Sequence, residues 1–300
     1  MPKISIVTHD AGAANHLFSW LKESIDTSSK FKVCAEGPSK KLFFDYFPEL
    51  TTVSLSECIE FSDTVITGTG WASDLEHQAR CLSHQKGKMN IAFVDHWTNY
   101  KSRFIRNGIE QMPSEIWVAD SYAREMAEKI FHGTTVVEIE SFYLKNQIQE
   151  IHSLTPNNLQ ETNKWLFVME PIRDSWGQTK DLPEIESFRA FMGKLEALNN
   201  GVEVELIIKP HPSDPVDKYD FLTQEYTDFN LRVDNKSSLA SLIASSKVII
   251  GFQTYAMVVA LAAGKKVVGA LPGYAPPSLL PHNEIVLLFQ FLEDINNEIL

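Results

Sequence analysis

A histidine flanked by two prolines follows an apolar run in the second half of the chain. The run, Val204–Ile208, has the composition of a buried parallel strand, and it stops at Lys209–Pro212, which reads KPHP. Two prolines exclude regular backbone, so the His211 side chain is predicted to stand at the carboxyl end of a strand. Ligands bind at that edge in open α/β sheets. Lys209, His211 and Pro212 are therefore candidate contacts for an anionic group.

A strand–turn–helix unit later in the chain suits the same kind of ligand. A predicted strand at Val248–Ile250 is followed by Gly251, and the apolar helix Tyr255–Ala263 begins just beyond Thr254. A glycine at such a turn leaves the N–H groups of the helix start free to meet an anion. Together with the His211 loop, Gly251 and Thr254 predict a phosphate site shared by two adjacent loops.

Three predicted strands of the first half also end in residues that could do chemistry. Ile4–Thr8 is followed by His9–Gly12, which reads HDAG, and two later strands end at Gly68–Gly70 and at Asp95–His96. The carboxyl ends of parallel strands share one edge of a sheet. We therefore predict that these three groups lie together.

The carboxylates of this edge are the candidate catalytic groups. An Asp within hydrogen-bond reach of an acceptor hydroxyl can take up its proton, which makes Asp10 the first choice for a general base. The alternative is that Asp10 caps the following helix. Asp95 and His96 form a second candidate acid–base pair, since a neighbouring carboxylate shifts the titration of a histidine. In the other interpretation, the aromatic-rich segment after Asp95 is loop packing.

Sugar binding at this edge would need close backbone approach and a flat apolar surface. Small residues permit the first, and the rings of Trp97 and Tyr100 would supply the second. The glycines could equally serve tight turns. The candidate acceptor- or sugar-binding residues are His9, Gly12, Gly68, Thr69, Gly70 and Trp97.

The segment from Val204 to Ala270, with its KPHP strand and the later sequence SSKVIIGFQT, resembles the nucleotide-binding half of GT-B glycosyltransferases. More narrowly, it is similar to an HP-motif group of bacterial sialyltransferases, capsule transferases and CDP-glycerol glycerophosphotransferases. The resemblance implies that His211 and Thr254 contact the phosphate of a nucleotide-activated donor.

The same resemblance bears on two further segments. HP-type sialyltransferases carry a motif of two carboxylates and a glycine in the first domain. Asp10–Gly12 matches part of it, with His9 at the place of the first carboxylate. The loop that begins at Glu170 and Arg173 corresponds to one that often meets the donor in GT-B enzymes. Arg173 is thus a candidate phosphate contact, and the alternative of an ordinary surface arginine stays open.

Strands alternate with helix-length patterns throughout the chain. This alternation predicts parallel, doubly wound α/β sheets, in which Thr51–Val53 is included as a third strand. A polar, turn-rich stretch between Lys145 and Lys164 predicts two Rossmann-like domains, an acceptor-side domain at residues 1–150 and a nucleotide-donor domain at residues 151–300. The resemblance implies that the two domains face one cleft, as in the GT-B fold, and that the last helix crosses back to the first domain.

Composition argues against several classes of function. The chain has 300 residues, 44% of them hydrophobic, and a net charge of −12, which speaks against nucleic acid or an anionic bilayer as a partner. We expect no membrane span, because no run reaches about 18 apolar residues. We also expect no signal peptide, because the start leads straight into a strand. Three widely spaced cysteines and the lack of metal-ligand spacing predict a cytoplasmic protein without a metal or a cofactor.

Three functions fit these features. The first is a metal-independent, inverting transferase that moves a sugar or glycerol phosphate from a nucleotide-activated donor to a glycan or lipid-linked acceptor in surface polysaccharide biosynthesis. A CMP- or CDP-type donor is favoured over UDP. The second is a nucleotide-sugar epimerase or hydrolase on the same fold, which would need no separate acceptor, and the third is a nucleotide-sugar-binding protein without catalysis. The sequence leaves the sugar, the nucleotide base, the acceptor and the oligomeric state open.

Overall fold

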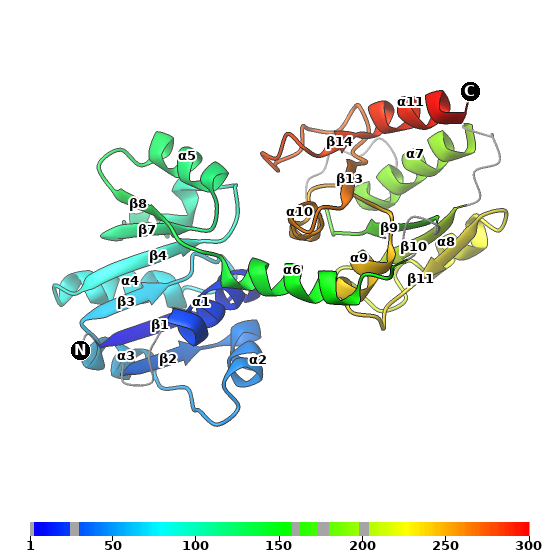
Figure 1. Ribbon diagram of the computed structural model, residues 1–300. Coiled ribbons are helices and arrows are strands. Elements are labelled where there is room, and N and C mark those ends of the chain that lie inside the picture. The colour runs from blue at the N-terminus through cyan, green and yellow to red at the C-terminus, as the bar shows by residue number, and fades with distance from the viewer. Residues whose placement is uncertain (1–2, 25–29, 158–162, 173–179, 198–203, 300) are drawn as a thin grey trace. The chain divides into compact units, whose positions relative to one another are not determined.

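The computed structural model describes residues 3–24, 30–157, 163–172, 180–197 and 204–299 (Figure 1). The chain divides into two compact units, Met1–Lys145 and Asn146–Leu300. The division falls within helix α6 (Phe142–Leu154), close to the boundary that the sequence analysis places after residue 150. Each unit is a parallel α/β domain with its own hydrophobic core.

The first unit is built on a sheet of six parallel strands in the order β2-β1-β3-β4-β7-β8. The strands are β1 (Ile4–Thr8), β2 (Phe31–Ala35), β3 (Thr64–Thr67), β4 (Met89–Val94), β7 (Glu115–Val118) and β8 (Thr135–Glu138). The helices are α1 (Ala11–Ser24), α2 (Gly37–Tyr46), α3 (Leu55–Phe61), α4 (Leu75–Gln85) and α5 (Ser121–Ile130). A short helix, η1 (Lys101–Phe104), leads into a hairpin of β5 (Ile105–Arg106) and β6 (Ile109–Glu110).

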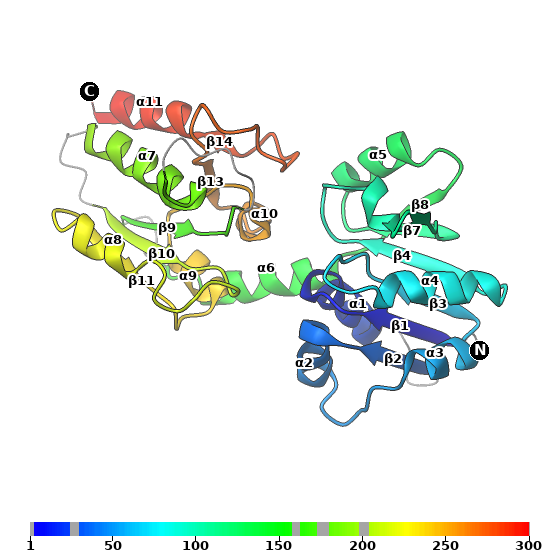
Figure 2. The same ribbon diagram turned by 180° about the vertical axis from the view of Figure 1, so that it is seen from behind.

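Successive residues of a strand point to opposite faces of this sheet. Ile6 shares a core with Phe18 of α1, whereas the next residue, Val7, shares a core with Ile59 of α3 and Leu75 of α4. Helices therefore cover both faces, as Figure 2 shows from the reverse side of Figure 1. Burial on both faces explains why these strands read as continuous apolar runs in the sequence.

The second unit repeats this design with the strand order β11-β10-β9-β12-β13-β14. The strands are β9 (Lys164–Val168), β10 (Glu205–Lys209), β11 (Asn230–Val233), β12 (Val248–Gly251), β13 (Lys266–Gly269) and β14 (Val286–Leu287). The helices are α7 (Pro183–Ala197), α8 (Asp220–Glu225), α9 (Leu239–Ser245), α10 (Tyr255–Ala262) and α11 (Leu288–Ile299). Aromatic packing anchors its core, where the rings of Phe167 in β9 and Phe188 in α7 lie 5.0 Å apart.

The winding of each sheet reverses at its first strand. In the first unit β2 lies on one side of β1 and β3 on the other, and in the second unit β10 and β12 flank β9. Open α/β sheets bind ligands in the crevice outside such a switch point. The loops after β1 and β3, and those after β9 and β12, therefore stand where a ligand is expected.

The predicted strands and helices are largely confirmed, with a difference near residue 50. Thr51–Val53 is not a strand, although the Val53 N–H donates to the Val33 carbonyl at 2.9 Å. The chain turns instead at Ser54, which forms a capping box with Glu57 at the start of α3. The helices α2 and α3 were not predicted, because each buries only two residues and so has a weak apolar pattern.

The cysteines and the helices bear on two other expectations. Cys34 and Cys58 are buried and Cys81 is half-buried, all as free thiols. Burial raises the pKa of the Cys58 thiol to about 11 and that of Cys34 to about 12, so both are protonated at neutral pH and act as packing groups.

Within the described part of the chain, no helix is long and apolar enough to cross a membrane.

Candidate functional site

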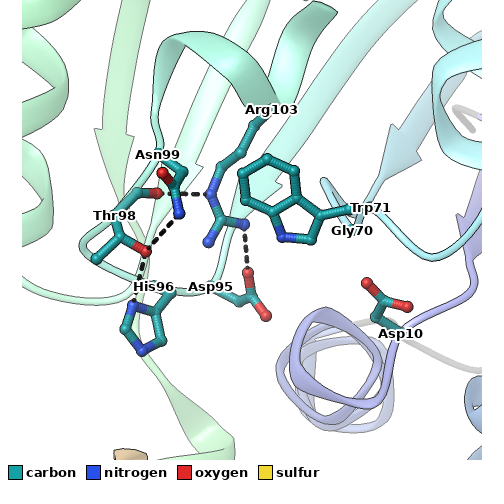
Figure 3. A pocket seen from close by; sticks show the side chains of 8 residues that line it. All are labelled: Asp10, Gly70, Trp71, Asp95, His96, Thr98, Asn99 and Arg103. Carbon is teal, nitrogen blue, oxygen red and sulfur yellow. Dashed lines mark hydrogen bonds and ion pairs between the residues drawn. The ribbon is translucent and has the colours of Figure 1, made fainter. Parts of the chain in front are cut away.

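A cavity of about 250 Å³ lies at the carboxyl edge of the first sheet (Figure 3). Its residues precede α1 or follow β3 and β4, and so they adjoin the switch point between β1 and β3. The lining residues are Asp10, Gly70, Trp71, Asp95, His96, Thr98, Asn99 and Arg103. Asp10, Gly70, Asp95 and His96 thus lie together, as the shared edge of parallel strands predicts.

Two glycines make room for the two carboxylates of this cavity. A Cβ atom on Gly70 would lie 1.7 Å from Oδ2 of Asp10, and one on Gly12 would lie 2.1 Å from Oδ2 of Asp95. Neither distance allows a side chain unless the carboxylate moves. Gly70 is therefore the seat of Asp10, and Gly12 is the seat of Asp95.

The buried guanidinium of Arg103 connects the walls of the cavity. Its Nη1 donates to Oδ1 of Asp95 at 2.9 Å and to Oγ1 of Thr69 at 3.0 Å, and its Nε donates to the Thr98 carbonyl at 2.9 Å. Thr69 donates in turn to the Phe93 carbonyl and is fully buried. Thr69 therefore supports the wall and presents no surface to a sugar. Arg103 could not be predicted from the sequence, because no motif links it to Asp95.

The charges around Asp95 keep it ionised. Burial by itself raises the pKa of this carboxyl, but the charge of Arg103 and its hydrogen bond, aided at acid pH by protonated His96 and His16, outweigh burial and hold the pKa of Asp95 below its usual range. Burial lowers the pKa of His96, which is therefore a neutral imidazole at pH 7. It also lowers the pKa of the buried His16 to about 4. Asp95 is thus a carboxylate already paired with Arg103, and a weak proton acceptor.

Asp10 is more open than Asp95. Its Oδ1 lies 2.9 Å from Nδ1 of His9, and the side chains of His9 and Asp10 keep 19% and 28% of their surface exposed. Since a carboxylate only accepts, Nδ1 is the donor, and in neutral His9 the Nε2 atom carries no proton. The Asp10 carboxylate pairs with His9 and lies against Gly70, so capping of α1 does not account for its position.

Trp71 is the open aromatic surface of this cavity. The residue is 47% exposed, and the guanidinium groups of Arg103 and Arg106 lie 5.7 and 5.9 Å from its ring centroid. Trp97, by contrast, is 3% exposed, and its indole N–H donates to both carboxylate oxygens of Asp120. Contrary to the expectation from the sequence, Trp97 packs in the core, and Trp71 offers the flat surface.

In the second unit, His211 stands in a turn directly after β10, as predicted, with Pro212 beside it. The backbone N–H of Ser213 donates to His211 Nδ1 at 3.2 Å, and the Ser213 hydroxyl lies 2.8 Å from the same atom. A backbone N–H can only donate, so Nδ1 is the acceptor and the proton of neutral His211 resides on Nε2. The turn thereby makes Nε2 the donor of this ring.

A buried ion network holds the His211 turn. The backbone N–H of His211 donates to Oδ2 of Asp214 at 3.1 Å, and the Tyr219 hydroxyl donates to the same oxygen at 3.0 Å. Lys218 Nζ bonds to Asp214 and to Glu184 at 2.7 Å each, with the lysine side chain 13% exposed. The turn is therefore tied by charge-assisted bonds to α7, through Glu184, and to the segment directly before α8.

Two residues predicted to contact phosphate have structural partners here. The Nζ of Lys209 donates to two backbone carbonyls of the loop after β11, at 3.3 and 2.8 Å, and so joins that loop to β10. A Cβ atom on Gly251 would lie 2.8 Å from Cγ2 of Val168 and 2.9 Å from Sδ of Met257. Gly251 is therefore required for the close packing of β12 and α10 on β9, a different reason from approach to an anion.

Thr254 and Glu170 order the loop after β12. Thr254 is the N-cap of α10 and accepts from the Ala256 N–H at 3.5 Å, which leaves the hydroxyl hydrogen for a second partner. Glu170, beyond the end of β9, accepts from the Gln253 N–H at 2.6 Å, and burial raises its pKa to about 7. Because β9 lies between β10 and β12, Glu170 follows the strand that separates those leading into the loops of His211 and Thr254.

Two further expectations concern Arg173 and metal ions. Arg173 lies outside the described residues. Among the residues that the structure describes, no group of three or more His, Cys, Asp and Glu side chains is arranged to hold a metal ion.

Known proteins resemble this chain in structure and not in sequence. No protein-family model matches the sequence, and no curated protein is significantly similar to it. A UDP-GlcNAc 2-epimerase from Methanocaldococcus jannaschii is similar in structure with a TM-score of 0.66 at 10% identity, over 97% of this chain and 92% of that one. For a UDP-GlcNAc 2-epimerase from Neisseria meningitidis bound to UDP-GlcNAc, the TM-score is 0.64 at 11% identity, over 99% and 91% of the two chains.

A transferase is similar as well. The glycosyltransferase of kitacinnamycin has a TM-score of 0.52 at 11% identity, over 91% of this chain and 81% of that one. The protein has the GT-B fold. At these identities the likeness concerns the fold, and activity must be argued from the site. The similarity to the HP-motif group stays a prediction.

Replacing Arg103 by alanine would leave the half-buried Asp95 without its partner. Removal of one member of a buried ion pair typically costs about 3–5 kcal/mol, so the free energy of unfolding of the first unit should fall by about that amount in urea denaturation. The matched control is Arg124→Ala, whose ion pair with Glu128 is on the surface and which should have a much smaller effect. Equal effects of the two substitutions would contradict the central role of Arg103.

Glu170→Gln keeps an acceptor for the Gln253 N–H and removes the ionisable carboxyl group. Because folding raises the pKa of Glu170 from 4.5 to about 7, the folded state binds more protons than the unfolded state in that interval. Stability contributed by Glu170 therefore falls as the pH rises from 4.5 to 7. Relative to the variant, the wild-type free energy of unfolding should decrease over this range by at most about 3 kcal/mol. Urea titrations at several pH values test this, and a pH-independent difference would refute it.

Proposed function

We propose that the protein is a metal-independent glycosyltransferase that moves a sugar, or glycerol phosphate, from a nucleotide-activated donor to a hydroxyl of a glycan or lipid-linked acceptor. The observation that carries the proposal is the cavity of the first unit, where the open carboxylate of Asp10 and the exposed ring of Trp71 line one space. Transfer to a hydroxyl needs a base beside the acceptor, and an amphipathic aromatic face suits a sugar ring.

The donor nucleotide is assigned to the second unit. His211 presents Nε2–H from the turn after β10, and Thr254 stands at the N-terminus of α10. These groups would stabilise the phosphate charge that develops as the nucleotide leaves, together with helix-start N–H groups. The HP motif favours a CMP- or CDP-type donor, whereas one structure of this fold was solved with UDP-GlcNAc and another with UDP. Donors linked to CMP, CDP and UDP are therefore all compared in the experiment below.

Asp10 is the proposed general base. It is the more exposed of the two cavity carboxylates, and His9 fixes its orientation through Nδ1. Asp95 is paired with Arg103, and its lowered pKa makes it the weaker base. Asp95 and the neutral imidazole of His96 are assigned to hydrogen bonds with acceptor hydroxyls.

Epimerisation of a nucleotide-sugar is the second candidate function. The observation in its favour is structural similarity to two UDP-GlcNAc 2-epimerases, which extends over at least nine-tenths of both chains. Such a reaction would use the same cavity and need no acceptor. Epimerisation that removes a proton from the inverting carbon and returns one from solvent places deuterium in the sugar in D₂O, and transfer does not.

The deciding experiment incubates the protein with CMP-, CDP- and UDP-sugars in D₂O, with and without a glycan acceptor. Transfer predicts release of nucleotide and extension of the acceptor only when the acceptor is present. Deuterium in the recovered nucleotide-sugar would establish the epimerase instead. Saturable binding without turnover of any donor would overturn both and leave a binding protein.

Asp10→Asn tests the assigned base. Loss of a general base typically lowers the rate about 10²–10⁴-fold, and turnover should fall by that amount while nucleotide affinity is unchanged, because the nucleotide is assigned to the other unit. Asn keeps the size of the side chain in its seat on Gly70. If Asp10→Asn retains full turnover and Asp95→Asn abolishes it, the base belongs to the Asp95–His96 pair.

His211→Ala tests the donor site. A charge-assisted bond to phosphate is worth about 1.5–3 kcal/mol, so calorimetry should show nucleotide affinity reduced roughly tenfold to a hundredfold. The control is His84→Ala, an exposed histidine of α4 in the first unit, which should leave the affinity unchanged. Unchanged affinity in His211→Ala for every nucleotide that binds would make His211 a turn residue only.

A further inference from the structure

Glu76, in the first turn of α4, is a buried carboxyl outside the lining of the cavity. The residue is 1% exposed. Its Oε1 accepts from the backbone N–H of His9 at 3.0 Å, and its Oε2 accepts from the backbone N–H of Gly70 at 2.5 Å. His9 and Gly70 follow β1 and β3, the strands on the two sides of the switch point. One carboxylate therefore joins both strand ends.

The surroundings of Glu76 are shaped for this carboxylate. A Cβ atom on Gly68 would lie 2.4 Å from Oε1 of Glu76 and 2.8 Å from the Cβ of Ala13, so a larger residue would displace the acid. The Gly68 carbonyl is itself held by Nη1 of Arg80 at 3.0 Å. Burial raises the pKa of Glu76 to about 7, and Asp10 adds to the rise, while the two N–H bonds and Arg80 oppose it. A carboxyl is unfavourable in a core unless its oxygens are hydrogen-bonded, and both of these are.

The two N–H groups that Glu76 binds belong to the residues that set the place of Asp10. His9 precedes Asp10 and its ring bonds to the Asp10 carboxylate at 2.9 Å. Gly70 is the seat on which that carboxylate rests, and a movement of either residue would displace it. We infer that Glu76 is a positioning residue for Asp10, which fixes the backbone that carries the base relative to the glycine that seats it. This inference rests on the proposed function, in which Asp10 is the base.

Glu76→Gln tests the inference. Glutamine keeps the size of the side chain but offers one acceptor in place of two, and its NH₂ group would face a backbone N–H. We expect kcat to fall about 10- to 100-fold, since a displacement of about 1 Å at a catalytic group has effects of that order. The Kd for the nucleotide should stay unchanged, and the amide hydrogens of His9 and Gly70 should exchange faster than in the wild type.

Three further variants separate positioning from a general structural role. Glu57→Gln is the matched control, because Glu57 also accepts a backbone N–H at a helix start, in α3, and it should leave kcat unchanged. Glu76→Asp retains two acceptor oxygens and should keep more of kcat than Glu76→Gln. In an Asp10→Asn background Glu76→Gln should add little, because residues that act as a unit are not additive.

Unchanged kcat in Glu76→Gln, or a full additional loss in the Asp10→Asn background, would overturn the inference. If Glu76→Gln does not fold, the same measurements on Glu76→Asp decide it, with an intermediate loss of kcat expected and an unchanged kcat overturning it. Hydrogen exchange requires no turnover. A wild-type protein that turns over no donor therefore removes the proposed function, whereas unchanged exchange at His9 and Gly70 in the variant removes the positioning role of Glu76.

Discussion

The candidate site of the first unit depends on one buried guanidinium, that of Arg103. It bonds to the Asp95 carboxylate, the Thr69 hydroxyl and the Thr98 carbonyl at once, from nitrogens that the planar guanidinium holds in fixed directions, whereas a lysine would offer all its donors from one atom. The ion pair keeps the half-buried Asp95 ionised and holds its pKa below the usual range, so Asp95 is a weak proton acceptor. Asp10 is then left as the open carboxylate of the cavity. Two acids a short distance apart thus acquire different properties from their surroundings.

A second constraint recurs in both units, where a glutamate, buried in the first unit and half-buried in the second, ties together two strand ends at the switch point. Glu76 accepts from His9 and Gly70 in the first unit, and Glu170 accepts from Gln253 in the second. Strands part at a switch point, so backbone N–H groups beyond their ends lose the neighbouring strand as a partner and must find another. A carboxylate serves this purpose, and its burial raises the pKa of both glutamates to about 7.

Most of the fold could be predicted because a parallel strand that is buried on both faces has a continuous run of apolar residues in the sequence. The prediction failed where local chemistry outweighs that pattern, as at Thr51–Val53, where Ser54 starts a helix. Residues at strand ends, such as Asp10 and Asp95, could be placed together because parallel strands share one edge. Arg103 could not, since it reaches Asp95 from a loop with no regular repeat. The sequence also could not show which of Trp71 and Trp97 is buried, because both lie in a loop shortly after a strand.

By itself, the sequence determined most of the order of strands and helices, the two-unit α/β architecture and the residues at the carboxyl edges, since these follow from local periodicity. The tertiary structure decided what each of those residues touches. Gly12, Gly68 and Gly70 have the composition of a ligand-approach loop, yet they make space for Asp95, Glu76 and Asp10. Lys209 has the charge to bind a phosphate, yet its ammonium donates to backbone carbonyls. Contacts of this kind join residues far apart in the chain, and only packing brings them within the few ångströms at which a hydrogen bond or an ion pair forms.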